Sequence, residues 1–571
     1  MSEARPLDVV LCWHMHQPQY RRASTGEFQL PWTYLHAIKD YADMAWHLEQ
    51  NRDARAVVNL TPILLDQIDD YADQFAKRSF RDPLLRALAD PEQVRAEDLP
   101  GLIEACFRAN ASRMIRRHEP YQRLRDAYES ARAGSFHGYL STRFLIDVCV
   151  WYHLAWLGES IAREDPRAIR LRDKGADFEA ADREALLDLM GEIVQGIIPR
   201  YTALTKSGRV ELSTTPYTHP ILPLLIDFNA AHESMPDAPL PNAPRYPGGI
   251  SRAQTQLTSA IDSHNSRFGK PPAGCWPSEG AVSKEALGLL AASGFAWTAS
   301  CETVLTRSPG SAGAAMPPRE AILYHPYMVD ADEGGNIALF FRDVRLSDLI
   351  GFRYADWHAD DAVANLVGEL EGIAAAVASQ HAPVVSIILD GENAWEHYPE
   401  NAFYFLSALY RSLSAHPGIR LTTYSEYLMR NVPTAKLDAL VAGSWVYGTL
   451  STWIGEPAKN RAWDILAAAK SDFDRAASSG SLTGDRLVAA EAQLKVCEGS
   501  DWFWWFGDDN PAETVSDYDR LFRDHIADLY ALIGVRVPES IGAVIGVGHG
   551  APEHGGTMRS NPESVADGGH P

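Results

Sequence analysis

Residues 384–397 read Val-Val-Ser-Ile-Ile-Leu-Asp-Gly-Glu-Asn-Ala-Trp-Glu-His. An apolar run without alternation leads directly into Asp390, and Gly391 follows at once. A run of this kind predicts a strand that is buried on both faces of a parallel sheet. An acid at the C-terminal end of such a strand is typical of an α/β active site.

Similar apolar runs recur along the chain and predict further strands at 7–13, 56–60, 210–213, 274–276, 295–298 and 337–341. Helical patterns separate most of them, and this alternation predicts a parallel sheet, most simply a barrel or a distorted barrel. From about 65 to 200, apolar residues recur at helical spacing. We therefore expect a helical insertion between strands of the barrel.

Three regions are expected. Residues 1–430 form the catalytic barrel with its insertion, and 431–540 form a C-terminal helical domain that completes the active-site groove. Residues 541–571 are rich in Gly, His, Pro, Ser and Glu with almost no apolar period. That composition predicts a disordered tail.

Net charge restricts the partners of the chain. The 571 residues carry 52 Lys and Arg against 75 Asp and Glu, a net charge of −23. This balance opposes binding to nucleic acid or to an anionic membrane surface, and it does not affect a neutral polysaccharide. The 15 Trp and 22 Tyr offer flat faces for sugar rings, although core packing accounts for many of them.

Cysteine usage indicates the compartment. Six cysteines are scattered without a C-x-x-C pair, so neither a zinc-thiolate site nor a disulfide framework is indicated. The first apolar run lacks the basic lead-in and the length of a signal peptide, and later runs are shorter than a bilayer span. We expect a cytoplasmic enzyme.

Two acids stand out as catalytic candidates. Glu279 follows a short strand in Gly-Cys-Trp-Pro-Ser-Glu-Gly (274–280), where Trp276 and Pro277 could present it rigidly. Asp390 ends its own strand, and its apolar surroundings should raise its pKa and favour the protonated form. Two acids on separate strands suggest a glycosidase. Glu392 and Glu396 compete for these roles, and each acid could instead be a solvated loop residue.

His14 and His16 lie on one face of the first strand, because alternate residues of a strand share a face. They could bind a divalent metal, as in metal-dependent amidohydrolases. They could instead hydrogen-bond to sugar hydroxyls. A third alternative is a structural role, in which their hydrogen bonds are satisfied at the end of the strand. The other metal-ligand candidates, His219, His325 and Asp390, are scattered in the sequence.

The loop after the third strand is stiffened by three prolines within 210–223 and carries Glu211, Tyr217 and His219. Prolines reduce the entropy that is lost when a loop is ordered. The loop could therefore hold sugar-binding groups still, or it could be a rigid structural element.

Taken in order, these motifs resemble those of glycoside hydrolase family 57. They are His16-Gln17-Pro18, Glu211 with 214–220, Trp276 to Gly280, and Asp390 to Asn393. The segments 453–463 and 500–507 resemble the α-amylase and amylopullulanase-like branch of that family. The resemblance covers nearly all of residues 7–530.

The resemblance implies a retaining enzyme that acts on α-glucans or maltooligosaccharides, on an incomplete (β/α)7 barrel followed by a helical domain. It implies that Glu279 is the nucleophile and Asp390 the general acid/base, with no metal and no cofactor. The expected substrate-binding residues are His14, His16, Glu211, His219, Trp276, Trp453 and Trp505.

One departure concerns the acceptor side, where Thr449-Leu450 stands in place of a polar Asn followed by an aromatic residue. The shared motifs leave open whether water or a sugar accepts the glycosyl group. The alternatives are therefore a 4-α-glucanotransferase or branching enzyme, a metal-dependent hydrolase that uses His14 and His16, and a carbohydrate-binding protein on an inactive fold.

Overall fold

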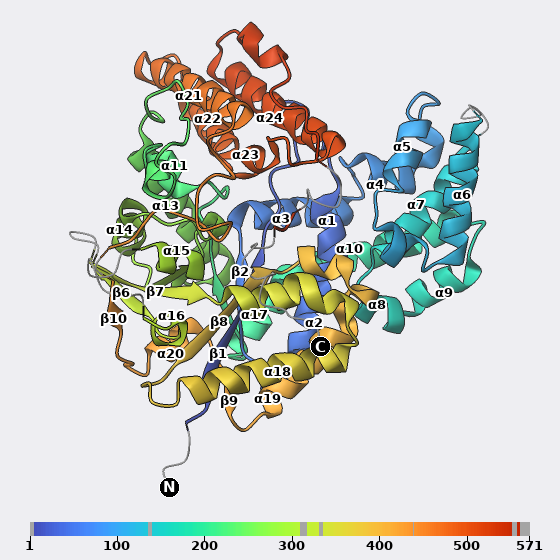
Figure 1. Ribbon diagram of the computed structural model, residues 1–571. Helices are drawn as coiled ribbons and strands as arrows, with labels where there is room; N and C mark the ends of the chain where they lie inside the picture. The colour runs from blue at the N-terminus through green and yellow to red at the C-terminus, as the bar shows by residue number, and fades with distance from the viewer. Residues whose placement is uncertain are drawn as a thin grey trace.

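A curved sheet of ten strands forms the centre of the computed structural model, which describes residues 5–134, 140–308, 317–330, 335–437, 439–550 and 557–559. The barrel-like part consists of strands that run parallel to their neighbours. They are β1 (Leu7–Met15), β2 (Ala56–Leu60), β3 (Val210–Ser213), β4 (Gly274–Cys275), β5 (Trp297–Cys301), β7 (Asn336–Arg342) and β8 (Val384–Asp390). The predicted parallel sheet is therefore confirmed (Figure 1).

The barrel is incomplete, as we expected. β7 and β8 pair at one register position, Arg342 with Ser386. Among the described residues, β3 and β4 are joined by one isolated β-bridge, between Thr214 and Cys275, and not by a ladder. The sequence did not reveal three short strands: β6 (Tyr327–Asp330), which is antiparallel to β7, β9 (Ile419–Leu421) and β10 (Ala435–Lys436).

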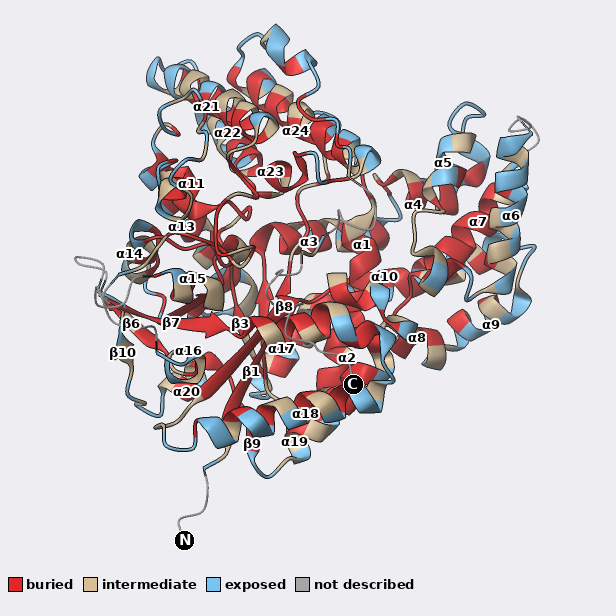
Figure 2. Cartoon of the chain, viewed as in Figure 1, coloured by how far each residue is buried: buried red, intermediate tan, exposed pale blue. Residues whose placement is uncertain are grey.

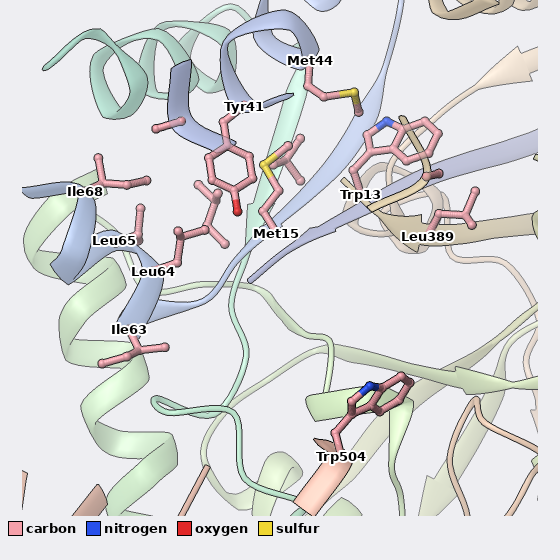
Figure 3. Close-up of a cluster of buried hydrophobic side chains, with 14 of the residues drawn as sticks. Trp13, Met15, Tyr41, Met44, Ile63, Leu64, Leu65, Ile68, Leu389 and Trp504 are labelled. Carbon is pink, nitrogen blue, oxygen red and sulfur yellow. The ribbon is translucent and has the colours of Figure 1, made fainter. Parts of the chain in front are cut away.

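Alternation along β1 separates two cores. Val10 and Cys12 belong to an inner cluster with Trp297 and Phe340, which fills the barrel. Val9, Leu11 and Trp13 face outward into the large core beneath the helices, and Figure 3 shows Trp13 close to Leu389 there. Every residue of β1 is buried, which explains the apolar run from Val9 to Trp13 (Figure 2).

The predicted helical insertion is present between β2 and β3. It consists of α3 (Pro62–Lys77), α4 (Pro83–Ala89), α5 (Leu99–Ala105), α6 (Glu119–Ala133), α7 (Thr142–Ala155), α8 (Glu159–Glu164), α9 (Pro166–Lys174) and α10 (Ala180–Lys206). Most of these helices form a lobe to one side of the sheet in Figure 1.

A second helical region lies above the C-terminal ends of the strands in Figure 1. It contains α21 (Pro457–Ser478), α22 (Gly484–Cys497), α23 (Asp501–Trp505) and α24 (Ala512–Ile533). None of the helices in the described ranges is both apolar enough and long enough to cross a bilayer.

The chain stays packed beyond residue 540, where we expected a tail to begin. Ile545 donates its backbone N–H to Asp519 at 2.7 Å, and Gly550 donates its own to the Asn510 carbonyl at 3.0 Å. These contacts hold residues 541–550 against the helical region. The rest of the expected tail, apart from 557–559, lies outside the described residues.

Candidate active site

Asp390 and His14 meet at the mouth of the barrel because of strand register. Asp390 shares the inner face of β8 with Ile388, and His14 shares the inner face of β1 with Cys12. The two are direct partners across the β1–β8 ladder. Asn393 donates to Asp390 at 2.9 Å.

Glu279 follows β4 in a tight turn with φ 59° and ψ 22°. This left-handed conformation is costly for a residue other than glycine, about 1–3 kcal/mol, and such strain is concentrated at functional sites. Gly280 also has φ 59°, and a Cβ there would lie 2.8 Å from the Trp276 ring. Trp276 therefore packs directly against the turn that presents Glu279.

Trp445 fixes the Glu279 carboxyl group. Its Nε1 donates to Glu279 Oε2 at 2.7 Å, and its backbone N–H donates to the Glu279 carbonyl at 2.9 Å. A charge-assisted bond of this kind favours the ionised carboxylate. Trp445 lies far from Glu279 in the sequence, and no motif indicated the contact.

Glu279 and Asp390 line a common pocket of about 570 Å³. Burial, and then the nearby Asp390 charge, raise the pKa of Glu279 well above its ordinary value. Burial raises the pKa of Asp390 to about 6, in the direction we predicted. Two neighbouring carboxyl groups with raised pKa values favour a state near neutral pH in which the pair carries one proton. The hydrogen bond from Trp445 favours Glu279 as the ionised member of the pair.

Three histidines form one side of the pocket. His14 Nε2 lies 3.1 Å from His219 Nε2, and the rings of His16 and His219 stack with centroids 3.9 Å apart. Burial lowers the pKa of His14 to about 3 and that of His219 well below its ordinary value. Both rings are therefore neutral at pH 7.

Asp501 reaches this cluster from α23 and lies 2.9 Å from His16 Nε2. Potential ligand atoms of His16, His219 and Asp501 all lie within 4.8 Å of one another, so the set could hold a metal ion. The sequence did not indicate Asp501 as a neighbour of His16, because 485 residues separate the two.

Glu392 also lines the pocket and is fully buried. Its Oε1 accepts from the His16 backbone N–H at 3.0 Å and from the Tyr41 hydroxyl at 3.1 Å. Burial, and then the charge of Asp390, raise the pKa of Glu392. These bonds tie Glu392 to β1 and to the helix that follows it.

The aromatic run of α23 divides between two surroundings. Trp502 packs toward Phe522, and Phe503 stacks on Trp463 at 4.2 Å, both within the helical region. Trp504 and Trp505 line the pocket. Successive helical residues turn by about 100°, so adjacent aromatic residues face different ways.

Three of the expected substrate-binding residues are absent from the lining of this pocket. Glu211 accepts from Trp297 Nε1 at 2.7 Å and from the Ser425 hydroxyl at 2.6 Å, so its carboxylate is held elsewhere in the barrel. Trp276 and Trp453 are completely buried in the cores. His14, His16, His219 and Trp505 line it, and their role in substrate binding stays a prediction.

The fold and the pair of acids at the ends of parallel strands define the class of protein as a glycoside hydrolase. The sequence model of glycosyl hydrolase family 57 matches residues 10–439. The chain therefore belongs to this family. A search of curated proteins finds no match.

Solved structures share the fold at low sequence identity. A branching enzyme of this family from Pyrococcus horikoshii has a TM-score of 0.57 at 16% identity, covering 92% of this chain and 89% of that one. The α-amylase AmyC from Thermotoga maritima has a TM-score of 0.56 at 13% identity, with 94% and 95% covered. A 4-α-glucanotransferase from Thermococcus litoralis has a TM-score of 0.50 at 13% identity, with 92% and 60% covered.

Proposed function

We propose that the protein is a retaining glycosidase that acts on α-glucans by double displacement. The observation that carries the proposal is the pair of buried carboxyl groups, Glu279 and Asp390, which come from different strands and share one pocket. Similarity to an α-amylase and a 4-α-glucanotransferase supports the α-glucan class. The unpaired cysteines support a cytoplasmic location.

In this mechanism Asp390 protonates the glycosidic oxygen while the Glu279 carboxylate attacks the anomeric carbon. A covalent glycosyl-enzyme forms on Glu279, and the aglycone leaves with the proton. Asp390, now ionised, takes a proton from the incoming acceptor, which then releases the sugar from Glu279. The neutral histidines and Glu392 are placed to bind sugar hydroxyls, and Trp505 to pack on a ring.

Either water or a sugar hydroxyl could be the acceptor, so amylase or amylopullulanase-like hydrolysis and transfer by a 4-α-glucanotransferase or branching enzyme share this chemistry. Incubation with maltotriose and longer maltooligosaccharides separates them. Shorter products alone indicate hydrolysis, whereas longer products reveal transfer. The absence of any new product would contradict the proposal itself.

The cluster of His16, His219 and Asp501 supports a second candidate, a metal-dependent hydrolase. We favour the glycosidase, and we therefore expect activity on α-glucans to survive exhaustive chelation. The measurement is the metal content of the purified protein before and after chelation, together with its activity. Stoichiometric zinc or manganese that is lost together with activity would establish the second candidate instead.

A further inference from the structure

Residues 557–559 lie against the active-site pocket. Thr557 lines the pocket that contains Glu279 and Asp390. Thr557, Met558 and Arg559 also line an adjoining cavity of about 420 Å³, which includes Asp390 but not Glu279. This cavity therefore extends the pocket on the Asp390 side.

Arg559 anchors this segment. Its side chain is only 8% exposed, and its guanidinium carbon lies 5.1 Å from the centre of the Trp504 ring. Nη2 donates to Asn510 Oδ1 at 3.5 Å, and Nη1 lies 3.7 Å from Asp509. Cation–π contact and ion pairing thus hold the segment to α23 and the loop that follows it.

The Arg559 guanidinium still has hydrogen-bonding capacity. Its Nε is buried and has no hydrogen-bond partner among the described residues. A buried donor without a partner is costly, and an incoming sugar hydroxyl would satisfy it. Burial raises the pKa of Glu279, and the positive charge of Arg559 opposes that increase. Arg559 is therefore close enough to influence the reacting groups.

We propose that residues 557–559 form the end wall of the glucan groove on the Asp390 side, and that Arg559 is the specificity-determining residue that holds this wall in place. The inference rests on the proposed function, in which Asp390 protonates the leaving oxygen and so marks the side of the leaving or acceptor chain. A wall there limits how far a glucan extends beyond the cleaved bond. Short maltooligosaccharides are then preferred over long polymers.

The first test substitutes Arg559 in the full-length protein. Arg559→Ala should raise the ratio of kcat/KM for amylose to kcat/KM for maltotriose by about tenfold, the size of effect expected when one steric or polar contact in a subsite is removed. Arg559→Lys should give an intermediate ratio, because an ammonium group lacks the planar stacking surface. Arg536→Ala, at a side chain that is 89% exposed, is the matched control and should leave the ratio unchanged.

A second test does not depend on the fold of the Arg559 variants. All six native cysteines are buried, so a maleimide should react with a Thr557→Cys variant at position 557 alone. Saturating maltohexaose should slow this labelling if the segment walls the groove. Unchanged labelling together with an unchanged substrate ratio would overturn the inference. A wild-type protein that turns over no α-glucan would contradict the proposed function instead.

Discussion

The Glu279 carboxyl group combines three properties that a purely structural acid does not need. Its backbone is left-handed, its pKa is raised by burial and by Asp390, and Trp445 holds one of its oxygens at 2.7 Å. Strain and desolvation both cost folding free energy. Both costs are reasonable where the carboxylate must be aimed at a reacting carbon.

Replacing Glu279 by Gln should abolish nearly all turnover while the fold is retained, because the amide is nearly isosteric but cannot form the ester intermediate. Steady-state kinetics on maltooligosaccharides and circular dichroism check both parts. Glu285→Gln, at an exposed position, is the matched control. Normal activity in Glu279→Gln would remove this residue from the mechanism. A crystal structure should also show the two carboxyl groups roughly 5–6 Å apart, as retention requires, and not near ~9 Å.

The pKa of Asp390 predicts how stability depends on pH. Burial raises it from 3.8 to about 6, so the folded state binds this proton more tightly than the unfolded state does. The stabilisation from this group is fully present below pH 3.8 and is lost as the pH rises through 6. The free energy of unfolding should fall by about 3 kcal/mol in total over this range. Asp390→Asn removes this loss, and its Tm should increasingly exceed that of wild type between pH 4 and pH 8.

Thermal unfolding of both proteins at several pH values is the measurement. Asp173→Asn, an exposed substitution, is the matched control. A Tm difference for Asp390→Asn that is the same at pH 4 and pH 8, or a lower Tm at pH 8, would contradict the assigned pKa.

At the scale of the element, α23 connects the helical region to the barrel. Trp502 is 1% exposed and donates to the Val496 carbonyl at 2.9 Å, which makes it a core residue. Trp505 lines the pocket and stacks on Tyr518 with centroids 4.8 Å apart. The same short helix therefore supplies both a core residue, Trp502, and a residue that lines the pocket, Trp505.

Alanine substitutions should separate these roles. Trp505→Ala should raise KM for maltooligosaccharides about two- to tenfold. This increase corresponds to the loss of an aromatic contact that contributes about 0.5–1.5 kcal/mol to binding. Trp502→Ala should instead lower the free energy of unfolding by about 3–5 kcal/mol and leave KM of the folded fraction unchanged. Denaturant titration and kinetics on both variants measure the difference. If both substitutions only destabilise the fold, Trp505 does not contact substrate.

The strands whose bounds the sequence predicted most closely are those whose residues are buried on both faces. β1, β2 and β8 are mostly apolar and buried throughout, and each was expected within two residues of its observed bounds. β4 was predicted as well, at 274–276, although it spans two residues. β10, which was missed, has two residues and no buried side chain, so it carries no periodic signal.

The acids of the site could be predicted because each follows its own strand. Asp501 and Trp445 could not, since their contacts join segments far apart in the chain. Glu211 was expected to bind substrate, and in the structure it is absent from the lining of the active-site pocket. Its position in a motif did not reveal that Trp297 and Ser425 bind its carboxylate.

At the scale of the whole molecule, the barrel and the helical region share one core. Trp463 of α21 packs against Phe228, which lies between β3 and β4 in the chain, with ring centroids 5.1 Å apart. Arg252 pairs with Glu498 at 2.6 Å across the same boundary, and both side chains are buried. The two regions therefore stabilise each other, and the site lies where they meet.

Calorimetry should accordingly show one unfolding transition for the barrel and the helical region, with calorimetric and van't Hoff enthalpies that agree. Arg252→Ala should lower the temperature of this single transition, because it leaves the buried Glu498 charge without its partner. Arg123→Ala, which breaks an ion pair between two exposed side chains within α6, is a control that should have a smaller effect. Two separate transitions in the wild-type protein would contradict the shared core.

The most direct test of the central claim is mass spectrometry of the protein after reaction with a fluorinated glucosyl fluoride that traps a glycosyl-enzyme. Two buried acids in one pocket, with Glu279 as the attacking group, predict a single added fluorohexosyl mass on the peptide that contains Glu279, because only the anomeric fluoride leaves. The Glu279→Gln variant should show no such mass. A fluorohexosyl group on another peptide, or turnover of the reagent without any adduct, would contradict the assignment of Glu279 as the nucleophile.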